Sequence, residues 1–476
     1  MADLVCSGDG TGFCNNLLWP LFHYIPLPVE AITTADAEFD AYKLANEAFA
    51  AAVLDCYEDG DIVWVHDYHL MLLPHLLRAK KPDMKIGFFF HTPFPAFEIY
   101  RMLPGRHELL QGVLAANLIG FHTHDYSRHF QKSCIRILGA KGEHEALVVT
   151  NPDGTNFTAR LGTFPIGIDP NKFLKTLEHA NMASIIAEYK REFKGRKVLL
   201  GIDRLDYIKG IQHKLYAFEK LLEKYPELRS EVVFVQIAVP SRTDVVEYQK
   251  LKSTTHELVG RVNGIYGGVG HAPIHYLDQS IPFDRMCALY RVADVMVITS
   301  IRDGMNLVAF EYIACQAKTE NVSGAPGTLI LSEFAGAAQS LGDAPLLVNP
   351  WSVTECSAAL HKALTMPLAE RTRRQESMYN YVTTQTAQRW ARDYIKGLLT
   401  ATATPLSWLK EIHTADDDIA AATAKATADK ASAGGSKTTV DARAVTINFS
   451  YGSKDSPVAS RDMFVRQSSM LNNIHL

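Results

Sequence analysis

The sequence predicts an α/β protein built from two doubly wound, Rossmann-like domains. Short apolar runs recur along most of the 476-residue chain and alternate with segments of helical periodicity. Strands that are apolar at every position, rather than at every second one, are typical of parallel sheets covered by helices on both faces. Hydrophobic residues make up 47% of the chain and charged residues 21%, which is enough apolar side chain to bury two such cores.

The first half of the chain contains three apolar runs that we predict as strands, at residues 61–66, 85–91 and 118–122. Residues 69–80 and 125–138 instead carry apolar side chains at the three- and four-residue spacing of a helix with one buried face. Strands that alternate with helices in this way predict βαβ units, in which neighbouring strands run parallel.

The second half repeats this alternation after a boundary near residues 164–170, where we expect a short strand flanked by two prolines. The later strands are expected at 197–201, 232–237, 294–299, 328–331 and 345–348, with helices such as 212–224 between them. We therefore predict one domain over 1–170 and a second over 171–385.

The composition changes after the second domain. Residues 386–407 are predicted to form a C-terminal helix that packs back on the domains. Residues 415–433 contain nine alanines and no bulky apolar residue except Ile419, so this stretch lacks a face to bury. We expect 408–476 to be a low-complexity, mostly disordered tail.

Charge and cysteine content argue against several classes of protein. Lys and Arg total 48 and Asp and Glu 52, a net charge of −4, which is unlike a globally basic nucleic-acid-binding protein. There is no run of 18 apolar residues and no signal-peptide pattern at the start, so no membrane association is expected. Seven scattered cysteines without CxxC spacing predict reduced thiols in a cytoplasmic protein, without disulfides or structural zinc.

Two cations follow the first strand of the second domain. Arg204 and Lys209 lie between that strand and the next helix. Free N–H groups, the positive end of the helix dipole and two cations together favour a pyrophosphate. The alternative is a pair of surface cations neutralised by Asp203 and Asp206.

Two acids follow the strand expected at 294–299. Asp303 precedes Gly304 at a loop-to-helix junction, and Glu311 comes eight residues later, about two helical turns. Carboxylates on one side of a cleft can accept hydrogen bonds from a ribose or sugar diol. Alternatively, Asp303 only caps a helix and Glu311 is a solvated helix residue.

In the first domain, polar residues follow two neighbouring strands. Asp67 follows the first and His91 the second, where they could hold sugar hydroxyls. Several histidines lie nearby, but their spacing does not match a helical metal-binding pair, so no metal is expected. Trp19 could stack on a sugar or belong to the core, and Arg242 adds a cation to the edge that carries Arg204.

Long motifs in this sequence resemble the trehalose-6-phosphate synthase family, glycosyltransferase family 20, with a fungal or otherwise eukaryotic character. They are WVHDYHLMLLP (64–74), FFHTPFP (89–95), FPIGID (164–169), DRLDYIKG (203–210), VPSRTDV (239–245), ELVGRVNG (257–264), RDGMNLVAFEY (302–312) and LSEFAGAAQSL (331–341). The resemblance covers about residues 13–397 in order. It implies a GT-B fold, in which two Rossmann-like domains face an interdomain cleft.

The resemblance also implies an activity: a retaining transfer of glucose from UDP-glucose to glucose 6-phosphate, giving α,α-trehalose 6-phosphate and UDP. His91, Asp303, Arg204 and Lys209 would be the catalytic residues, with no cofactor and no metal. The donor site would consist of Arg204, Lys209, Asp303, Gly304, Met305, Asn306, Leu307, Val308 and Glu311. The acceptor site would consist of Trp19, Asp67 and Arg242.

Members of the family begin with a strand and a Gly-rich loop that this sequence does not contain ahead of Phe13. We therefore expect an N-terminally truncated first domain and a weakened acceptor-phosphate site. Two other functions stay open: a non-catalytic or regulatory subunit of a trehalose synthase complex, and a related glucosyltransferase with another phosphorylated acceptor. The expected partners are the two substrates, with a homo-oligomer or a complex with a phosphatase subunit as further possibilities.

Overall fold

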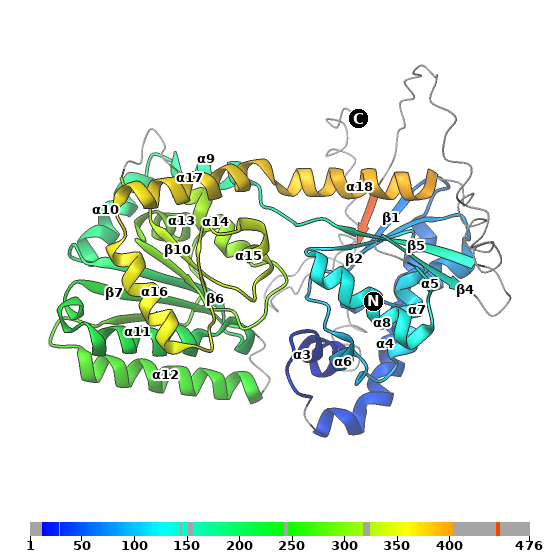
Figure 1. Ribbon diagram of the computed structural model, residues 1–476, viewed down its shortest axis with the longest axis horizontal. Helices are drawn as coiled ribbons and strands as arrows, with labels where there is room; N and C mark the ends of the chain where they lie inside the picture. Colours follow the sequence, from blue (N-terminus) through cyan, green and yellow to red (C-terminus); the bar gives the residue numbers. More distant parts are fainter. Residues whose placement is uncertain are drawn as a thin grey trace, which may run out of the picture.

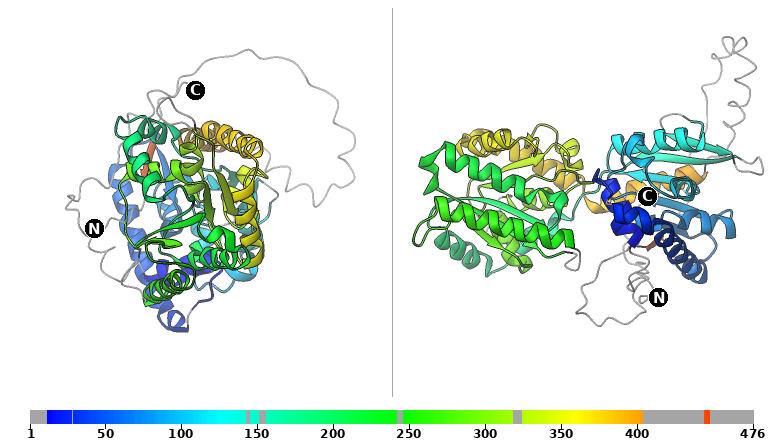
Figure 2. Two further views of the ribbon diagram at one scale, coloured as in Figure 1. Left: turned by 90° about the vertical axis from the view of Figure 1, so that its left-hand side faces the viewer. Right: turned by 90° about the horizontal axis from the view of Figure 1, so that it is seen from below.

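The computed structural model describes residues 12–27, 29–142, 145–150, 156–241, 246–317, 324–403 and 444–447. These residues form two lobes side by side, each built around one sheet, as Figures 1 and 2 show. We call them the first lobe, on the right in Figure 1, and the second lobe, on the left. The predicted α/β architecture with largely parallel sheets is confirmed.

The first sheet has the strand order β12-β1-β2-β3-β5-β4. Its strands are β1 (Ile62–His66), β2 (Lys85–Phe89), β3 (Leu118–Phe121), β4 (Ala146–Thr150), β5 (Asn156–Thr163) and β12 (Ala444–Ile447). All neighbours run parallel except β4 and β5, which form an antiparallel pair at one edge. Because β1 to β3 are buried almost throughout, they are apolar along their length and could be predicted from the sequence.

Helices cover the first sheet, and three of those in the described ranges precede its first strand in the chain. They are η1 (Phe13–Leu18), α3 (Trp19–Phe22), α4 (Val29–Cys56), η2 (Tyr68–Leu70), α5 (Leu73–Lys80), α6 (Phe97–Tyr100), α7 (Arg106–Leu114) and α8 (His124–Leu138). Thr123 caps α8 by accepting from the amide of Tyr126, and Gly139 ends the helix with φ +67°. These signals match the predicted helix at 125–138 within one residue.

The second sheet has the strand order β11-β10-β9-β6-β7-β8, and each neighbouring pair is parallel. Its strands are β6 (Lys197–Arg204), β7 (Val232–Val239), β8 (Ile274–Leu277), β9 (Val295–Ile298), β10 (Thr328–Ser332) and β11 (Leu346–Val348). The helical segments of this lobe are α9 (Pro170–Leu177), α10 (Met182–Glu192), η3 (Tyr207–Lys209), α11 (Ile211–Lys224), η4 (Pro226–Arg229), α12 (Val246–Tyr266), α13 (Phe283–Val292), α14 (Leu307–Cys315), α15 (Gly336–Leu341) and α16 (Val353–Thr365).

The last two described helices, α17 (Leu368–Thr384) and α18 (Ala387–Ala403), lead from the second lobe back to the first (Figure 1). On α18, the hydroxyl of Tyr394 donates to the carbonyls of Phe88 and Leu118, at 3.1 and 3.0 Å. A Cβ at Gly87 or Gly120 would overlap the Tyr394 ring, so these two strand glycines make room for the helix. Helix α18 thereby covers one face of the first sheet.

The structure corrects one detail of the sequence prediction and adds one strand that was not predicted. Residues 164–169 form no strand; they are an irregular connection, because two prolines and a glycine remove the regular pairing. Residues 444–447 lie within the tail expected to be mostly disordered, yet they pair in parallel with β1 as β12. The rest of that tail lies outside the described residues, and the domain boundary at residue 170 stays a prediction.

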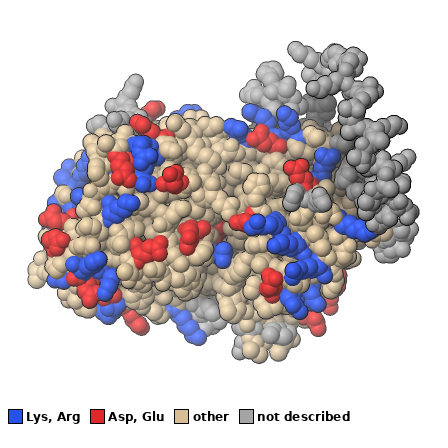
Figure 3. All heavy atoms as spheres, in the orientation of Figure 1, with Lys and Arg blue, Asp and Glu red and all other residues tan. Residues whose placement is uncertain are grey.

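Surface charge differs between the lobes on the face drawn in Figure 3. Lys and Arg gather over part of the first lobe, whereas the two signs alternate over the second. Helix α8 exposes Arg128, Lys132 and Arg136 at four-residue spacing. No helix in the described ranges is long and apolar enough to cross a membrane.

Candidate active site

The loop after β6 is anchored against the end of β9. Asp206 accepts a hydrogen bond from the amide of Ile208 and so begins η3, and Gly210 follows it with φ +63°. A Cβ at Gly210 would overlap the carbonyl of Thr299, whose own hydroxyl donates to the Gly210 carbonyl at 2.9 Å. Only glycine fits such a close contact between the two backbones. The contact holds Lys209, the residue before Gly210, next to the loop that follows β9.

Lys209 and Asp303 form an ion pair between these two loops, with Nζ 2.6 Å from Oδ2. The same carboxylate oxygen accepts from Asn306 at 3.0 Å and from the Ser300 hydroxyl at 3.2 Å. Burial alone would raise the pKa of Asp303, but the charge and hydrogen bond of Lys209, together with the hydrogen bond from Asn306, hold the pKa below its usual value. The acid is therefore ionised and fixed in position.

The amino end of α14 follows directly and contains the predicted donor residues Gly304 to Val308. Asn306 has φ +74° and caps the helix by accepting from the amide of Ala309, so the cap is Asn306 and not Asp303. The side chain of Met305 is buried in the core of the second lobe. The free N–H groups at this helix end suit an anionic or polyhydroxyl ligand.

Glu311 lies one helical turn farther along α14. The Tyr290 hydroxyl of α13 donates to Glu311 Oε2 at 2.8 Å, which orients the carboxylate. Burial raises the pKa of Glu311, and the hydrogen bond from Tyr290 opposes that rise. The structure records no direct bond between Glu311 and either predicted cation.

Arg204 connects the two lobes. Its guanidinium is half exposed, lies 3.7 Å from Asp206, and is centred 5.6 Å above the Trp19 ring of the first lobe. Trp19 is itself 8% exposed, and its ring lies 4.0 Å from that of His23 with 39° between their planes, so it belongs to the core of its lobe as well as to this contact. The geometry favours a cation–π contact between the lobes.

In the first lobe, Asp67 follows β1 in a strained conformation with φ +67°. One carboxylate oxygen accepts from the amides of His91 and Thr92, at 3.1 and 3.3 Å, and from the Thr92 hydroxyl at 3.1 Å. Burial raises the pKa of Asp67 to about 6 despite these bonds. Asp67 thus ties the loop after β1 to the loop after β2.

His91 follows β2 among other imidazoles. Its Nε2 lies 3.0 Å from Nδ1 of His66, the last residue of β1, and its ring lies 5.4 Å from that of His122. Burial lowers the pKa of His91 to about 4 and those of His66 and His122 well below the usual value. All three rings are therefore neutral near pH 7.

The two lobes touch at the predicted site. A Cβ at Gly304 would overlap the carbonyl oxygen of His91, so the loop after β9 lies directly against the loop after β2. The Tyr126 hydroxyl of α8 donates to the Asp303 carbonyl at 3.1 Å, and Gln339 of the second lobe donates to Asp125 at 2.8 Å. The charged residues of one lobe and the histidines of the other thus face one junction.

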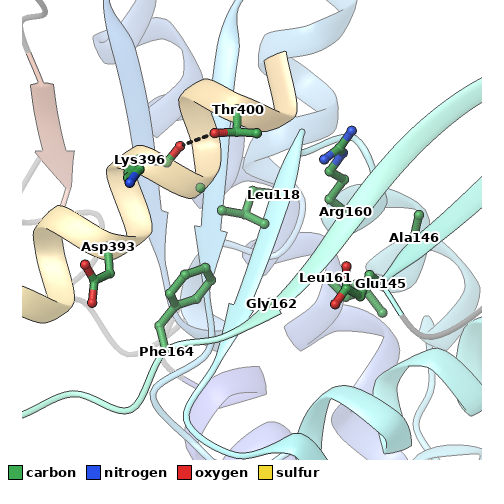
Figure 4. A pocket seen from close by; sticks show the side chains of 11 residues that line it. Leu118, Glu145, Ala146, Arg160, Leu161, Gly162, Phe164, Asp393, Lys396 and Thr400 are labelled. Carbon is green, nitrogen blue, oxygen red and sulfur yellow. Dashed lines mark hydrogen bonds between the residues drawn. The ribbon is translucent and has the colours of Figure 1, made fainter. Parts of the chain in front are cut away.

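A cavity of about 650 Å³ lies elsewhere, between α18 and the β3–β5 edge of the first sheet. Figure 4 shows the ring of Phe164 and the side chain of Leu118, with the charged side chains of Asp393, Lys396 and Arg160 around them. None of the predicted site residues lines it. In the described ranges, no three His, Cys, Asp or Glu side chains converge as a metal site would need.

Several side chains that hold the predicted residues were not themselves predicted, and one predicted residue lies outside the described ranges. His66 directly precedes Asp67, and Thr92 directly follows His91, in the same motifs. This adjacency in the sequence was the signal that could have identified them. Tyr290 lies on a different helix from Glu311, and no sequence pattern connects the two. Arg242 lies outside the described residues.

Comparison with known proteins gives extensive matches. Residues 5–400 match the family model described as glycosyltransferase family 20. A probable UDP-forming α,α-trehalose-phosphate synthase of Arabidopsis thaliana is 50% identical over 391 residues, covering 81% of this chain and 46% of that protein. The chain spans about half the length of the first curated relatives that it matches.

Solved structures share the fold. The E. coli trehalose-6-phosphate protein with bound UDP-2-fluoro glucose superposes with a TM-score of 0.76 at 34% identity, covering 84% of this chain and 86% of that one. The N-terminal domain of Candida albicans trehalose-6-phosphate phosphatase gives a TM-score of 0.76 at 35% identity, covering 83% and 81%. With a family model over most of its length and this shared GT-B fold, the chain belongs to glycosyltransferase family 20.

Proposed function

We propose that the chain is a retaining glucosyltransferase that transfers glucose from UDP-glucose to glucose 6-phosphate and releases α,α-trehalose 6-phosphate and UDP. The observation that carries the proposal is the Lys209–Asp303 ion pair, 2.6 Å long, set against the His91 loop of the other lobe by Gly304. The name of the Arabidopsis relative and the UDP-sugar analogue in the E. coli structure support the donor and the product.

In this proposal, the second lobe holds the donor. Arg204, Lys209 and the amino end of α14 neutralise the diphosphate as it leaves, and this stabilisation grows as charge develops in the transition state. Glu311, oriented by Tyr290, accepts the ribose hydroxyls. The fixed positions of these groups lower the cost of reorganisation during the reaction.

The first lobe holds the acceptor and the transferred sugar. Asp67 accepts hydrogen bonds from hydroxyl groups of the acceptor, and His91 contacts the glucose being transferred. The bond between the donor anomeric carbon and UDP breaks, and that carbon bonds to the anomeric oxygen of the acceptor. The acceptor proton leaves on the departing phosphate, and contact between the lobes excludes water.

A UDP-release assay with the full chain tests the proposal. UDP should form with both substrates at a rate well above the rate without glucose 6-phosphate. UDP formation that does not depend on glucose 6-phosphate, or no UDP at all, would reject the activity.

Size-exclusion chromatography with and without a trehalose phosphatase tests whether the chain forms a homo-oligomer or a complex with a phosphatase subunit. Fractionation of the source cells tests whether the protein is cytoplasmic.

A second candidate is a non-catalytic subunit that binds UDP-glucose. It is favoured by the shared fold of the N-terminal domain of the Candida albicans phosphatase, a protein named for a different activity. Tight UDP binding without turnover, together with co-purification with a second synthase, would support this candidate. Turnover by the isolated chain would eliminate it.

A further inference from the structure

Two imidazoles form a pair at the carboxyl end of the first sheet. His66 is the last residue of β1, and His91 follows the adjacent strand β2. Their rings lie 5.1 Å apart with 29° between their planes, and Nδ1 of His66 is 3.0 Å from Nε2 of His91. His66 is 4% exposed, so it cannot contact a ligand itself.

Aromatic side chains enclose this pair and hold both rings. The Trp390 ring of α18 lies 5.8 Å from His91 and 6.2 Å from His66, and Trp64 lies 4.6 Å from His66. In such an apolar setting both rings are neutral, so each carries one proton. One ring must then donate the bond between them and the other must accept it.

The surroundings of His66 decide which ring donates. Its other nitrogen, Nε2, is buried and has no hydrogen-bond partner within the described residues. A proton on that nitrogen would leave a buried N–H donor unpaired, and such orphaned donors are rarer in proteins than unpaired acceptors. The proton of His66 is therefore on Nδ1, which donates to Nε2 of His91, and the proton of His91 is on its remaining nitrogen, Nδ1.

We propose that His66 is a positioning residue that fixes the tautomer of His91, so that His91 presents Nδ1–H as a hydrogen-bond donor to a hydroxyl oxygen of the transferred sugar. This inference rests on the proposed function for the identity of the ligand. The orientation of the His91 ring and the position of its proton depend only on the contacts given above. His91 then acts on the sugar as a neutral donor and not as a base.

Three substitutions of His66 separate the effect of its hydrogen bond to His91 from the effect of its side-chain volume. In His66→Asn, the side-chain amide N–H can take the place of Nδ1–H. In His66→Gln, the side-chain amide lies near the position of Nε2 and therefore away from His91. In His66→Phe, an aromatic ring remains but no N–H group can donate to His91. The exposed His75 on α5 provides the control, His75→Phe.

We expect His66→Phe and His66→Gln to lower kcat about 10- to 100-fold, as loss of an orienting hydrogen bond does at other sites. Affinity for UDP, which lacks the transferred glucose that would contact His91, should stay within about twofold, and melting temperatures show which variants fold. His66→Asn should recover most of the kcat. Equal losses in all three variants, or no loss in His66→Phe, would overturn the proposal.

A readout that needs no turnover separates this inference from the proposed function. The ¹⁵N chemical shifts of the imidazoles in the full chain, with His91 assigned by comparison with His91→Gln, report which nitrogen carries the proton. We expect Nδ1–H in the wild type and a mixture of tautomers in His66→Phe. A wild-type His91 protonated on Nε2 would overturn the inference even if the enzyme is active, and the expected shifts would support it even if the enzyme is not.

Discussion

The two sheets differ in where their strands come from. The second sheet takes all of its described strands from residues 197–348, and every neighbouring pair is parallel. The first sheet has an antiparallel pair, β4 and β5, at one edge and a strand from residues 444–447 at the other. A sheet built from consecutive βαβ units can be read from local patterns, whereas the edges of the first sheet depend on which distant segment pairs with them.

The lobes also differ in the charge that they bring to their junction. The second lobe brings the ion pair of Lys209 and Asp303 together with Arg204. The first lobe brings imidazoles whose pKa values are lowered by burial, among them His91. We call the cation-bearing side of the junction, from the second lobe, the charged half, and the side with the neutral imidazoles, from the first lobe, the neutral half. The charged half suits a nucleoside diphosphate and the neutral half suits sugar hydroxyls, which are the roles that we propose for them.

Removing the cation of the charged half should have the largest effect. Lys209→Ala takes away a fixed positive charge beside the amino end of α14 and leaves Asp303 unpaired. We expect kcat to fall about 10²- to 10³-fold, as for loss of one preorganised transition-state contact. Steady-state kinetics measure the change, and Lys220→Ala, at an exposed position of α11, is the matched control. A loss below about threefold would remove Lys209 from the proposed role.

The contact between the halves is tested by Gly304→Ala. The added methyl group would overlap the His91 carbonyl and force the lobes apart. An overpacked contact costs about 1–3 kcal/mol, so kcat/KM should fall about 10- to 100-fold while UDP binding changes little. Gly260→Ala on α12, where nothing lies within 4 Å, controls for the loss of a glycine. Equal activity of the two variants would show that the contact is not needed.

Asp67 makes a prediction about pH. Its pKa is raised from 3.8 to about 6 by burial, so its contribution to stability is complete below pH 4 and is lost as the pH rises through 6. Asp67→Asn keeps an oxygen for the amides of His91 and Thr92 and should gain stability relative to the wild type as the pH rises from 4 to 7. The gain is at most about 3 kcal/mol at 1.36 kcal/mol per unit.

Thermal unfolding of both proteins across this pH range measures the difference. Asp59→Asn, at an exposed position, controls for the replacement of a carboxylate by an amide. A difference between Asp67→Asn and the wild type that stays constant with pH, or that shrinks as the pH rises, would contradict the raised pKa.

The distant edge strand should give the smallest effect. Consecutive N–H groups of a strand point to opposite sides, so only one of Val445→Pro and Thr446→Pro removes a hydrogen bond to β1. That variant should lose about 0.5–1.5 kcal/mol and show faster hydrogen exchange in residues 62–66. The other variant serves as its control. Unchanged exchange at β1 in both variants would show that the pairing contributes nothing.

The central strands and the helix that begins near residue 125 were predictable because each is buried and apolar over several residues. β12 was not predictable, because its Ala-Val-Thr-Ile run is short and only its pairing with β1 distinguishes it from the rest of the tail. At the site, the proximity of Lys209 to Asp303 followed from their positions after neighbouring strands. The bonds of Glu311 to Tyr290 and of His91 to His66 depend on packing across elements, which local patterns do not report.

The most direct test of the account is the ¹H NMR spectrum of the products formed by the full chain from UDP-glucose and glucose 6-phosphate. If the charged half holds the donor and the neutral half presents the sugar to the acceptor, a non-reducing disaccharide phosphate should accumulate in step with UDP. Both of its anomeric carbons should have the α configuration. Free glucose released with UDP, or a product with a β linkage at the transferred glucose, would contradict the proposed junction of the two lobes.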